Sequence, residues 1–367
     1  MNMKNTVLLF VVMLLCITAN AQEGVKFEEL TFKEALAKAK AENKLVFMDC
    51  YTSWCGPCKK MLNTVFVKKE AGDFFNSRFV NVKYDMEKGE GIELAKQFNI
   101  KKFPTFFIFR PDGTIQHKIG GAGSLNSFLS WVERGLNEKT SLDYLNKLYE
   151  KGPMDKKQLL DYYRTLAYAG ENEKSNTVLG ELKGKLDTKD RLQPEYWFLL
   201  KERPYGSEEC NFVVSNYSKL KENVGKETVD GYLESRYHKI LDQVIQREGG
   251  NNEKTMKEFF ERITKEWASM KWEPEKRLQN KMKLLQACLA QDSESIYACL
   301  DFGLNKQENP KWNFDVWVLL SALDFVNASG EKVDVQKLFA LEERVSGYFS
   351  SSANTRKRVQ AYFEKFR

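Results

Sequence analysis

Two cysteines separated by Gly-Pro are the residues of this sequence with the clearest chemical potential. Cys55 and Cys58 lie in the stretch "YTSWCGPCK", with Trp54 directly before them and lysine after them. Such a pair could bind a metal, cross-link the fold as an inert disulfide, or exchange electrons with disulfides in other proteins. These three alternatives make different demands on the rest of the sequence.

A metal site is disfavoured by the number of available ligands. A structural zinc ion normally needs four ligands, from two cysteine pairs or from one pair and two spaced histidines. The chain has one close cysteine pair and two isolated histidines, His117 and His238. Lys59 follows Cys58 where covalent haem attachment would need histidine. We therefore predict no metal, and no cofactor other than a redox-active Cys55–Cys58 disulfide.

An inert cross-link is disfavoured because closing so short a loop removes little entropy from the unfolded chain. If a helix starts at Cys55, its sulfur faces the unpaired N–H groups and the positive end of the helix dipole, which stabilise a thiolate. Cys58, one turn further along, should be more shielded and suits a resolving thiol. Pro57 is compatible with the first turn of a helix and fixes the geometry of the pair. Thiol–disulfide exchange is the favoured chemistry.

Strand and helix patterns alternate around the cysteine pair, between residues 25 and 137. Short apolar runs predict strands at 45–51, 79–85, 104–110 and 114–120, and the turn Pro111-Asp112-Gly113 makes the last two a hairpin. Helical patterns occupy 31–44, the segment after Cys55, an insert near 68–78, 91–100 and 124–136. This order predicts an α/β domain over 22–138, with a mixed sheet and helices on both of its faces.

The chain changes character near residue 139. Residues 139–367 show almost no strand alternation, and helical segments recur with short polar breaks and glycines at several ends. We predict an all-helical domain over 139–367, with helix-pair spacing near that of TPR-like repeats, although no motif is sharp enough to count copies. Cys210, Cys288 and Cys299 are interpreted as core thiols, and a bond between the last two is left open.

The first residues predict export. Lys4 supplies a positive charge, residues 7–17 form an apolar run, and Ala19-Asn20-Ala21 has the small-x-small pattern of a cleavage site. The sequence thus predicts a signal peptide over 1–21 and a periplasmic or secreted protein. The run is shorter than the roughly 20 residues of a spanning helix, and no later stretch is apolar enough, so we expect no membrane span after cleavage.

The charged residues give no sign of a nucleic-acid partner. The chain carries 57 basic and 51 acidic residues, a net charge of +6, and the two signs are interspersed along the helical segments. Interspersed charges are typical of solvated helix faces, whereas nucleic-acid binding needs a basic patch. We expect no nucleic-acid binding.

Three strings carry a family resemblance. The strings "LVFMDCYTSWCGPCKKM", "VNVKYD" and "FPTFFIF" occur in this order. Together they resemble the thioredoxin family over roughly residues 25–137, and the order of strand, cysteine motif and helix is the one that family requires. The fuller pattern, with the insert near 68–78, is similar to exported thioredoxin-like proteins. It is also similar to the soluble C-terminal domain of membrane thiol–disulfide interchange reductases.

The resemblance implies roles for matched residues. Asp49 falls where the family keeps a buried acid that accepts the proton of the resolving thiol. Pro104 matches the cis-proline that lies against the cysteine pair and meets the substrate backbone, and Trp54 matches the aromatic residue bordering the site. The implied catalytic residues are thus Cys55, Cys58 and Asp49, and the implied substrate-binding residues are Trp54, Gly56, Pro57, Phe103 and Pro104.

The sequence departs from the family pattern at two positions. Asn81 stands where thioredoxin often has a lysine near the buried acid, so the electrostatic environment of Asp49 is left open. Phe103 precedes the matched proline in place of a small aliphatic residue, which would alter substrate choice. The helical region has no counterpart in the minimal family.

The resemblance implies an enzyme that exchanges its dithiol with disulfides in other proteins. The Gly-Pro dipeptide is similar to that of reducing members, which favours a protein-disulfide reductase fed by an upstream donor such as a membrane thiol reductase. Two alternatives stay open: a binding or chaperone-like protein whose helical domain is the functional part, and a disulfide isomerase.

Overall fold

The computed structural model describes residues 24–305, 316–328, 334–348 and 353–367. The predicted signal peptide, residues 1–21, lies outside the described residues. The chain divides into two compact units, with the boundary between Leu186 and Asp187. Each unit is described separately.

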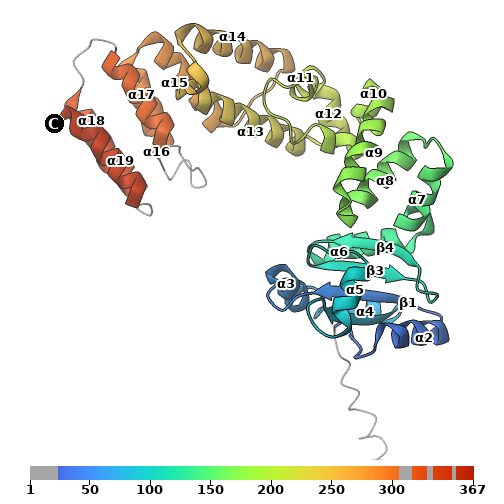
Figure 1. Ribbon diagram of the computed structural model, residues 1–367. Helices are drawn as coiled ribbons and strands as arrows, with labels where there is room; N and C mark the ends of the chain where they lie inside the picture. Colours follow the sequence, from blue (N-terminus) through green and yellow to red (C-terminus); the bar gives the residue numbers. More distant parts are fainter. Residues whose placement is uncertain (1–23, 306–315, 329–333, 349–352) are drawn as a thin grey trace, which may run out of the picture. The chain divides into compact units, whose positions relative to one another are not determined.

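The first unit contains one four-stranded sheet (Figure 1). Its strands are β1 (Leu45–Tyr51), β2 (Phe79–Asp85), β3 (Thr105–Phe109) and β4 (Ile115–Gly120), in the spatial order β2-β1-β3-β4. β1 pairs parallel with β2 and antiparallel with β3, and β3 and β4 form an antiparallel hairpin. The predicted mixed sheet is confirmed.

Five helices accompany the strands, where the sequence patterns predict them. Thr31 caps the helix that begins at Phe32, because its side chain accepts the Glu34 N–H while the Glu34 carboxylate accepts the Thr31 N–H. The predicted insert near 68–78 forms a helix of its own. The helices are α2 (Phe32–Glu42), α3 (Gly56–Thr64), α4 (Lys69–Asn76), α5 (Glu90–Gln97) and α6 (Leu125–Leu136).

The helices cover both faces of the sheet, because successive strand residues point to opposite sides. Phe47 of β1 packs on one face with residues of α3, α4 and α6, such as Met61, Phe75 and Phe128. Met48 packs on the other face with residues of α2 and α5, such as Leu94. Alternation along β1 therefore places Asp49 on the face that α3 covers.

Three further helices belong to the same compact unit: α7 (Leu142–Lys151), α8 (Lys156–Ala169) and α9 (Asn172–Lys185). Both α7 and α8 contact β4. The Leu142 N–H donates to Nδ1 of His117 at 3.1 Å, and the rings of Trp131 and Tyr168 stack with centroids 5.2 Å apart. The sequence places a domain boundary after residue 138. The compact unit extends past that point because β4 and α6 bury side chains against α7 and α8.

The described residues of the second unit form helices and connecting segments, without a strand. Its cysteines Cys210, Cys288 and Cys299 are buried and free, as is Cys50 in the first unit. A TPR-like repeat stays a prediction. Across the described ranges, no helix combines the length and hydropathy that a bilayer span requires. The α-helices are α10 (Thr188–Arg191), α11 (Glu208–Ser215), α12 (Tyr217–Val224), α13 (Lys226–Ile245), α14 (Glu253–Met270), α15 (Lys276–Ala290), α16 (Ser293–Leu304), α17 (Val316–Ala328), α18 (Val335–Tyr348) and α19 (Ala353–Phe363).

Candidate active site

The cysteine pair lies where β1 passes into α3. Cys55 is the N-cap residue of α3, Cys58 lies in its first turn, and the two form a disulfide with Cα atoms 5.3 Å apart. Pro57 occupies the first turn, where its missing N–H would have had no partner within the helix. The predicted helix start at the cysteine pair is confirmed.

The two sulfurs differ in their hydrogen bonds rather than in their exposure. Cys58 was expected to be the more shielded residue, but both cysteines are 2% exposed. The Cys58 N–H, one of the donors at the start of α3, points at Sγ of Cys55 at 3.1 Å. This donor and the positive end of the helix dipole would stabilise negative charge on the Cys55 sulfur in the reduced protein.

Exposed residues surround the buried disulfide. Trp54 is 65% exposed, and Gly56 and Pro57 are also at the surface. The Trp54 Nε1–H donates to both carboxylate oxygens of Glu87, at 3.0 and 3.1 Å. The Trp54 and Phe103 rings are nearly perpendicular, with centroids 6.1 Å apart. Glu87 is a contact of this site that the sequence did not single out.

The loop before β3 reaches the same end of the sheet. Thr105, the first residue of β3, is in register with Cys50 near the end of β1, so Pro104 lies close to the strand end that leads into the cysteine motif. The Phe103–Pro104 peptide bond is cis, as the resemblance implies. Pro104 is buried and Phe103 is partly buried.

Asp49 is a buried carboxyl group on the face of β1 that α3 covers. It is 1% exposed, and its Oδ1 has no hydrogen-bond partner among the described residues. Burial disfavours the charged carboxylate and raises the pKa of Asp49 to about 7, although the nearby Lys83 charge acts in the opposite direction. A carboxyl group with this pKa can exchange a proton with a thiol near neutral pH.

Lys83 supplies the positive charge next to Asp49. The two residues are in register on the parallel strands β1 and β2. Asn81, where the family often has lysine, instead donates from its side-chain amide to Oδ1 of Asn76 at 3.2 Å. Lys83 was not predicted from the sequence, although aligning the two seven-residue strand patterns would have paired it with Asp49.

Both histidines have polar partners within the protein. His117 is buried in the first unit beside α6 and α7, and His238 lies in the second unit with Nε2 3.3 Å from a Glu275 carboxylate oxygen. Over the ranges that the structure describes, no three side chains of histidine, cysteine, aspartate or glutamate are grouped to hold a metal ion.

The fold and the site together define a thiol–disulfide oxidoreductase: a Cys-Gly-Pro-Cys pair begins a helix after strand β1 of a mixed sheet, and this helix packs on the sheet face where Asp49 is buried. The thioredoxin family profile matches residues 23–134. Thioredoxin-1 of Drosophila melanogaster is 35% identical over 86 residues, which cover 22% of this chain and 76% of that protein. The chain belongs to the thioredoxin family.

Two solved structures are each similar to about a third of the chain. A suggested disulphide-isomerase from Bacteroides thetaiotaomicron is 43% identical and covers 31% of this chain and 94% of its own, with a TM-score of 0.30. The C-terminal domain of Neisseria meningitidis DsbD is 24% identical to this chain. The match covers 30% of this chain and 98% of that domain, with a TM-score of 0.26. The family profile ends before the all-helical part begins.

Proposed function

We propose that this protein is an exported reductase of disulfides in other exported proteins. The observation that carries the proposal is the placement of the Cys55–Cys58 pair at the N-terminus of α3, on the sheet face that holds the buried Asp49. This arrangement provides a stabilised thiolate, a second thiol within reach of it, and a proton acceptor with a pKa of about 7.

The first step is attack by the Cys55 thiolate on one sulfur of a substrate disulfide. A new bond joins Cys55 Sγ to that sulfur, the substrate S–S bond breaks, and the other substrate sulfur leaves as a thiolate that takes a proton from water. The Cys58 N–H that points at Cys55 Sγ stabilises the attacking thiolate.

The second step releases the substrate. Cys58 gives its thiol proton to Asp49 and attacks Cys55 Sγ, so that the Cys55–Cys58 disulfide forms and the remaining substrate sulfur leaves as a thiolate. Two electrons have then passed to the substrate. A donor dithiol must return them, and in an oxidising compartment we infer that a membrane thiol reductase supplies them.

Export is inferred from the N-terminal sequence. The charged start, the apolar run of residues 7–17 and the Ala19-Asn20-Ala21 pattern support a cleaved signal peptide. Mass spectrometry of the protein from the cell envelope or medium should find Gln22 as the N-terminal residue. A full-length chain in the cytoplasm would contradict export.

Cysteine variants test the redox assignment. Cys55→Ser should abolish insulin reduction with dithiothreitol as donor, and Cys58→Ser should accumulate a mixed disulfide through Cys55. Cys210→Ala, which removes a buried cysteine of the second unit, is the matched control and should keep full activity. Full activity in Cys55→Ser would overturn the assignment.

The same variants distinguish the two rival functions. A binding or chaperone-like protein would retain its partner interactions when Cys55 and Cys58 are both serine, and it would not reduce insulin. An isomerase would restore activity to scrambled ribonuclease faster than its reductase rate explains. We place reduction first because the helix that begins with the cysteine pair packs on the sheet face where Asp49 is buried, an arrangement that a scaffold does not need.

A further inference from the structure

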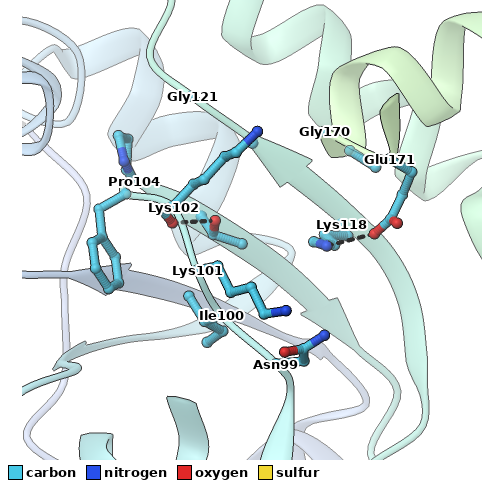
Figure 2. A pocket seen from close by; sticks show the side chains of 13 residues that line it. Asn99, Ile100, Lys101, Lys102, Pro104, Lys118, Gly121, Gly170 and Glu171 are labelled. Atoms are coloured by element: carbon cyan, nitrogen blue, oxygen red, sulfur yellow. Dashed lines mark hydrogen bonds and ion pairs between the residues drawn. The ribbon is translucent and has the colours of Figure 1, made fainter. Parts of the chain in front are cut away.

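A cavity of about 430 Å³ lies beside Pro104 in the first unit. Its lining comes from three segments: the loop 99–105, the end of β4, and the junction between α8 and α9. Figure 2 shows the loop with Lys101 and Pro104 along one side, and Lys118, Gly170 and Glu171 on the other. The cavity is therefore continuous with the proposed substrate-binding loop.

The cavity wall carries a net positive charge. Lys101, Lys102 and Lys118 contribute three ammonium groups, and Glu171 contributes the single carboxylate. Lys118 Nζ forms an ion pair with Glu171 at 2.6 Å (Figure 2). Lys101 and Lys102 are exposed, and neither pairs with a carboxylate in the part of the chain that the structure describes. Two positive charges thus remain available to a ligand.

The all-helical part of the chain builds one wall of this cavity. Gly170 ends α8 in the left-handed conformation with φ 75°, which turns the chain directly into α9. An added Cβ on Gly120 would lie 3.4 Å from the Ala169 carbonyl oxygen, so the end of β4 and the end of α8 approach closely. Ala169, Gly170 and Glu171 lie beyond residue 134, where the family match ends.

We propose that this cavity binds an acidic segment of the substrate protein, located a few residues from the disulfide that Cys55 attacks. The inference rests on the proposed function and adds a substrate class to it. A substrate chain that crosses Pro104 toward the cysteine pair continues past Lys101 and Lys102. Carboxylates at that point of the substrate gain charge-assisted hydrogen bonds, whereas lysines would be repelled.

Synthetic peptides provide the test. Three peptides contain the same intramolecular disulfide, flanked on both sides by Glu-Glu, Ser-Ser or Lys-Lys. The full mature chain should reduce the Glu peptide with kcat/KM about tenfold above that of the Lys peptide at low ionic strength, because each exposed charge pair contributes about two- to fivefold. In 0.5 M NaCl the ratio should fall toward one, since salt screens exposed charges.

Reversing single charges tests whether Lys101 and Lys102 cause the preference for the Glu peptide. Lys101→Glu and Lys102→Glu should each lower the ratio of kcat/KM between the Glu peptide and the Lys peptide by about fivefold. Lys68→Glu makes the same change at an exposed position near α4, which lies against β2 at the opposite edge of the sheet, and should leave the ratio unchanged. Glu171→Gln, which removes the negative charge on the helical wall, should raise the ratio.

The outcomes separate the inference from the function on which it rests. Reduction of all three peptides at equal rates, or equal effects of Lys68→Glu and Lys101→Glu, would overturn the acidic-segment site while leaving the reductase intact. Failure to reduce any peptide, although the Cys55–Cys58 disulfide itself can be reduced and reoxidised, would overturn the proposed function.

Discussion

Asp49 and Lys83 lie at the same register of the neighbouring parallel strands β1 and β2. Burial raises the pKa of the Asp49 carboxyl group to about 7, and the Lys83 charge limits this rise. The pair sets the proton affinity of the only acid that we assign to the catalytic site. The first three predictions concern this pair.

Asp49→Asn should slow release of the substrate more than the initial attack. Only Cys58 must lose a proton inside the protein, and asparagine cannot accept it. At pH 7 we expect the resolution step to slow by about 100-fold and the attack step by much less. Stopped-flow measurement of formation and decay of the mixed disulfide separates the steps, and equal slowing of both would contradict this role of Asp49.

Lys83→Met should move the pH dependence of resolution upward. Removing the cation takes away the interaction that lowers the Asp49 pKa, so the carboxyl group should ionise at a higher pH, by up to about one unit. The resolution rate measured from pH 5 to 9 reports this shift. Lys88→Met, whose lysine pairs with Asp85 and not with Asp49, is the control. A downward shift in Lys83→Met would refute the electrostatic assignment.

The buried Asp49 carboxyl group should also lower the free energy of unfolding at neutral and alkaline pH. Because its folded pKa, about 7, exceeds its ordinary value of 3.8, the folded state holds the proton more tightly. Folding is therefore penalised as pH rises from about 4, and the penalty is complete above about 7. Asp49→Asn should raise the unfolding free energy of the oxidised protein by about 2–4 kcal/mol at pH 8.

Urea unfolding at pH 4 and pH 8 checks the Asp49 stability effect. The gain in Asp49→Asn should fall below about 1 kcal/mol at pH 4, because the folded carboxyl group is protonated there and the unfolded one, with its ordinary pKa of 3.8, is only about half ionised. Asp73→Asn changes an exposed carboxylate of α4 and should show no comparable difference between the two pH values. An equal gain at both pH values would assign the effect to packing instead.

His117 should make the first unit sensitive to acid. Burial, together with the Arg134 charge, lowers the pKa of the His117 imidazole from 6.5 to about 3. The unfolded chain takes up the proton first, so stability that is complete above about pH 6.5 is lost as the pH falls toward 3. The steepest loss is about 1.4 kcal/mol per pH unit.

His117→Asn keeps an acceptor for the Leu142 N–H and cannot become charged. In the His117→Asn variant, the urea concentration at the unfolding midpoint of the first unit should decrease less between pH 6.5 and 4.5 than in the unmodified protein. His238→Asn removes the histidine of the second unit and serves as control. An unchanged pH dependence in His117→Asn would show that other groups cause the acid sensitivity.

The fragment 22–186 should be more stable than the fragment 22–138. The shorter fragment contains the cysteine pair and Asp49, but it loses the partners of His117 and Trp131. Removing the Trp131–Tyr168 stack and a buried hydrogen bond should lower the unfolding free energy by about 2 kcal/mol or more.

Thermal unfolding and insulin reduction compare the fragments. Both should reduce insulin at low temperature, and the shorter one should lose activity first on heating. Equal midpoints for the two fragments would mean that α7, α8 and α9 add nothing to the stability of the sheet.

The catalytic pair and the helices and strands around it could be predicted from the sequence. Gly-Pro between two cysteines, short apolar runs and capping residues such as Thr31 act within a few residues, so their structural effects can be read along the chain. The helix start at Cys55, the hairpin and the mixed sheet followed from such patterns. The cis bond before Pro104 followed from the family resemblance.

Contacts between segments that are distant in the sequence could not be predicted in this way. The register between β1 and β2 brings Lys83 to Asp49, and packing on β4 joins α7, α8 and α9 to the sheet. Likewise, Glu171 reaches the loop cavity beside Pro104 only because α8 ends against β4. Strand register and helix docking depend on side chains far apart in the sequence, and helical periodicity does not specify which surface a helix covers.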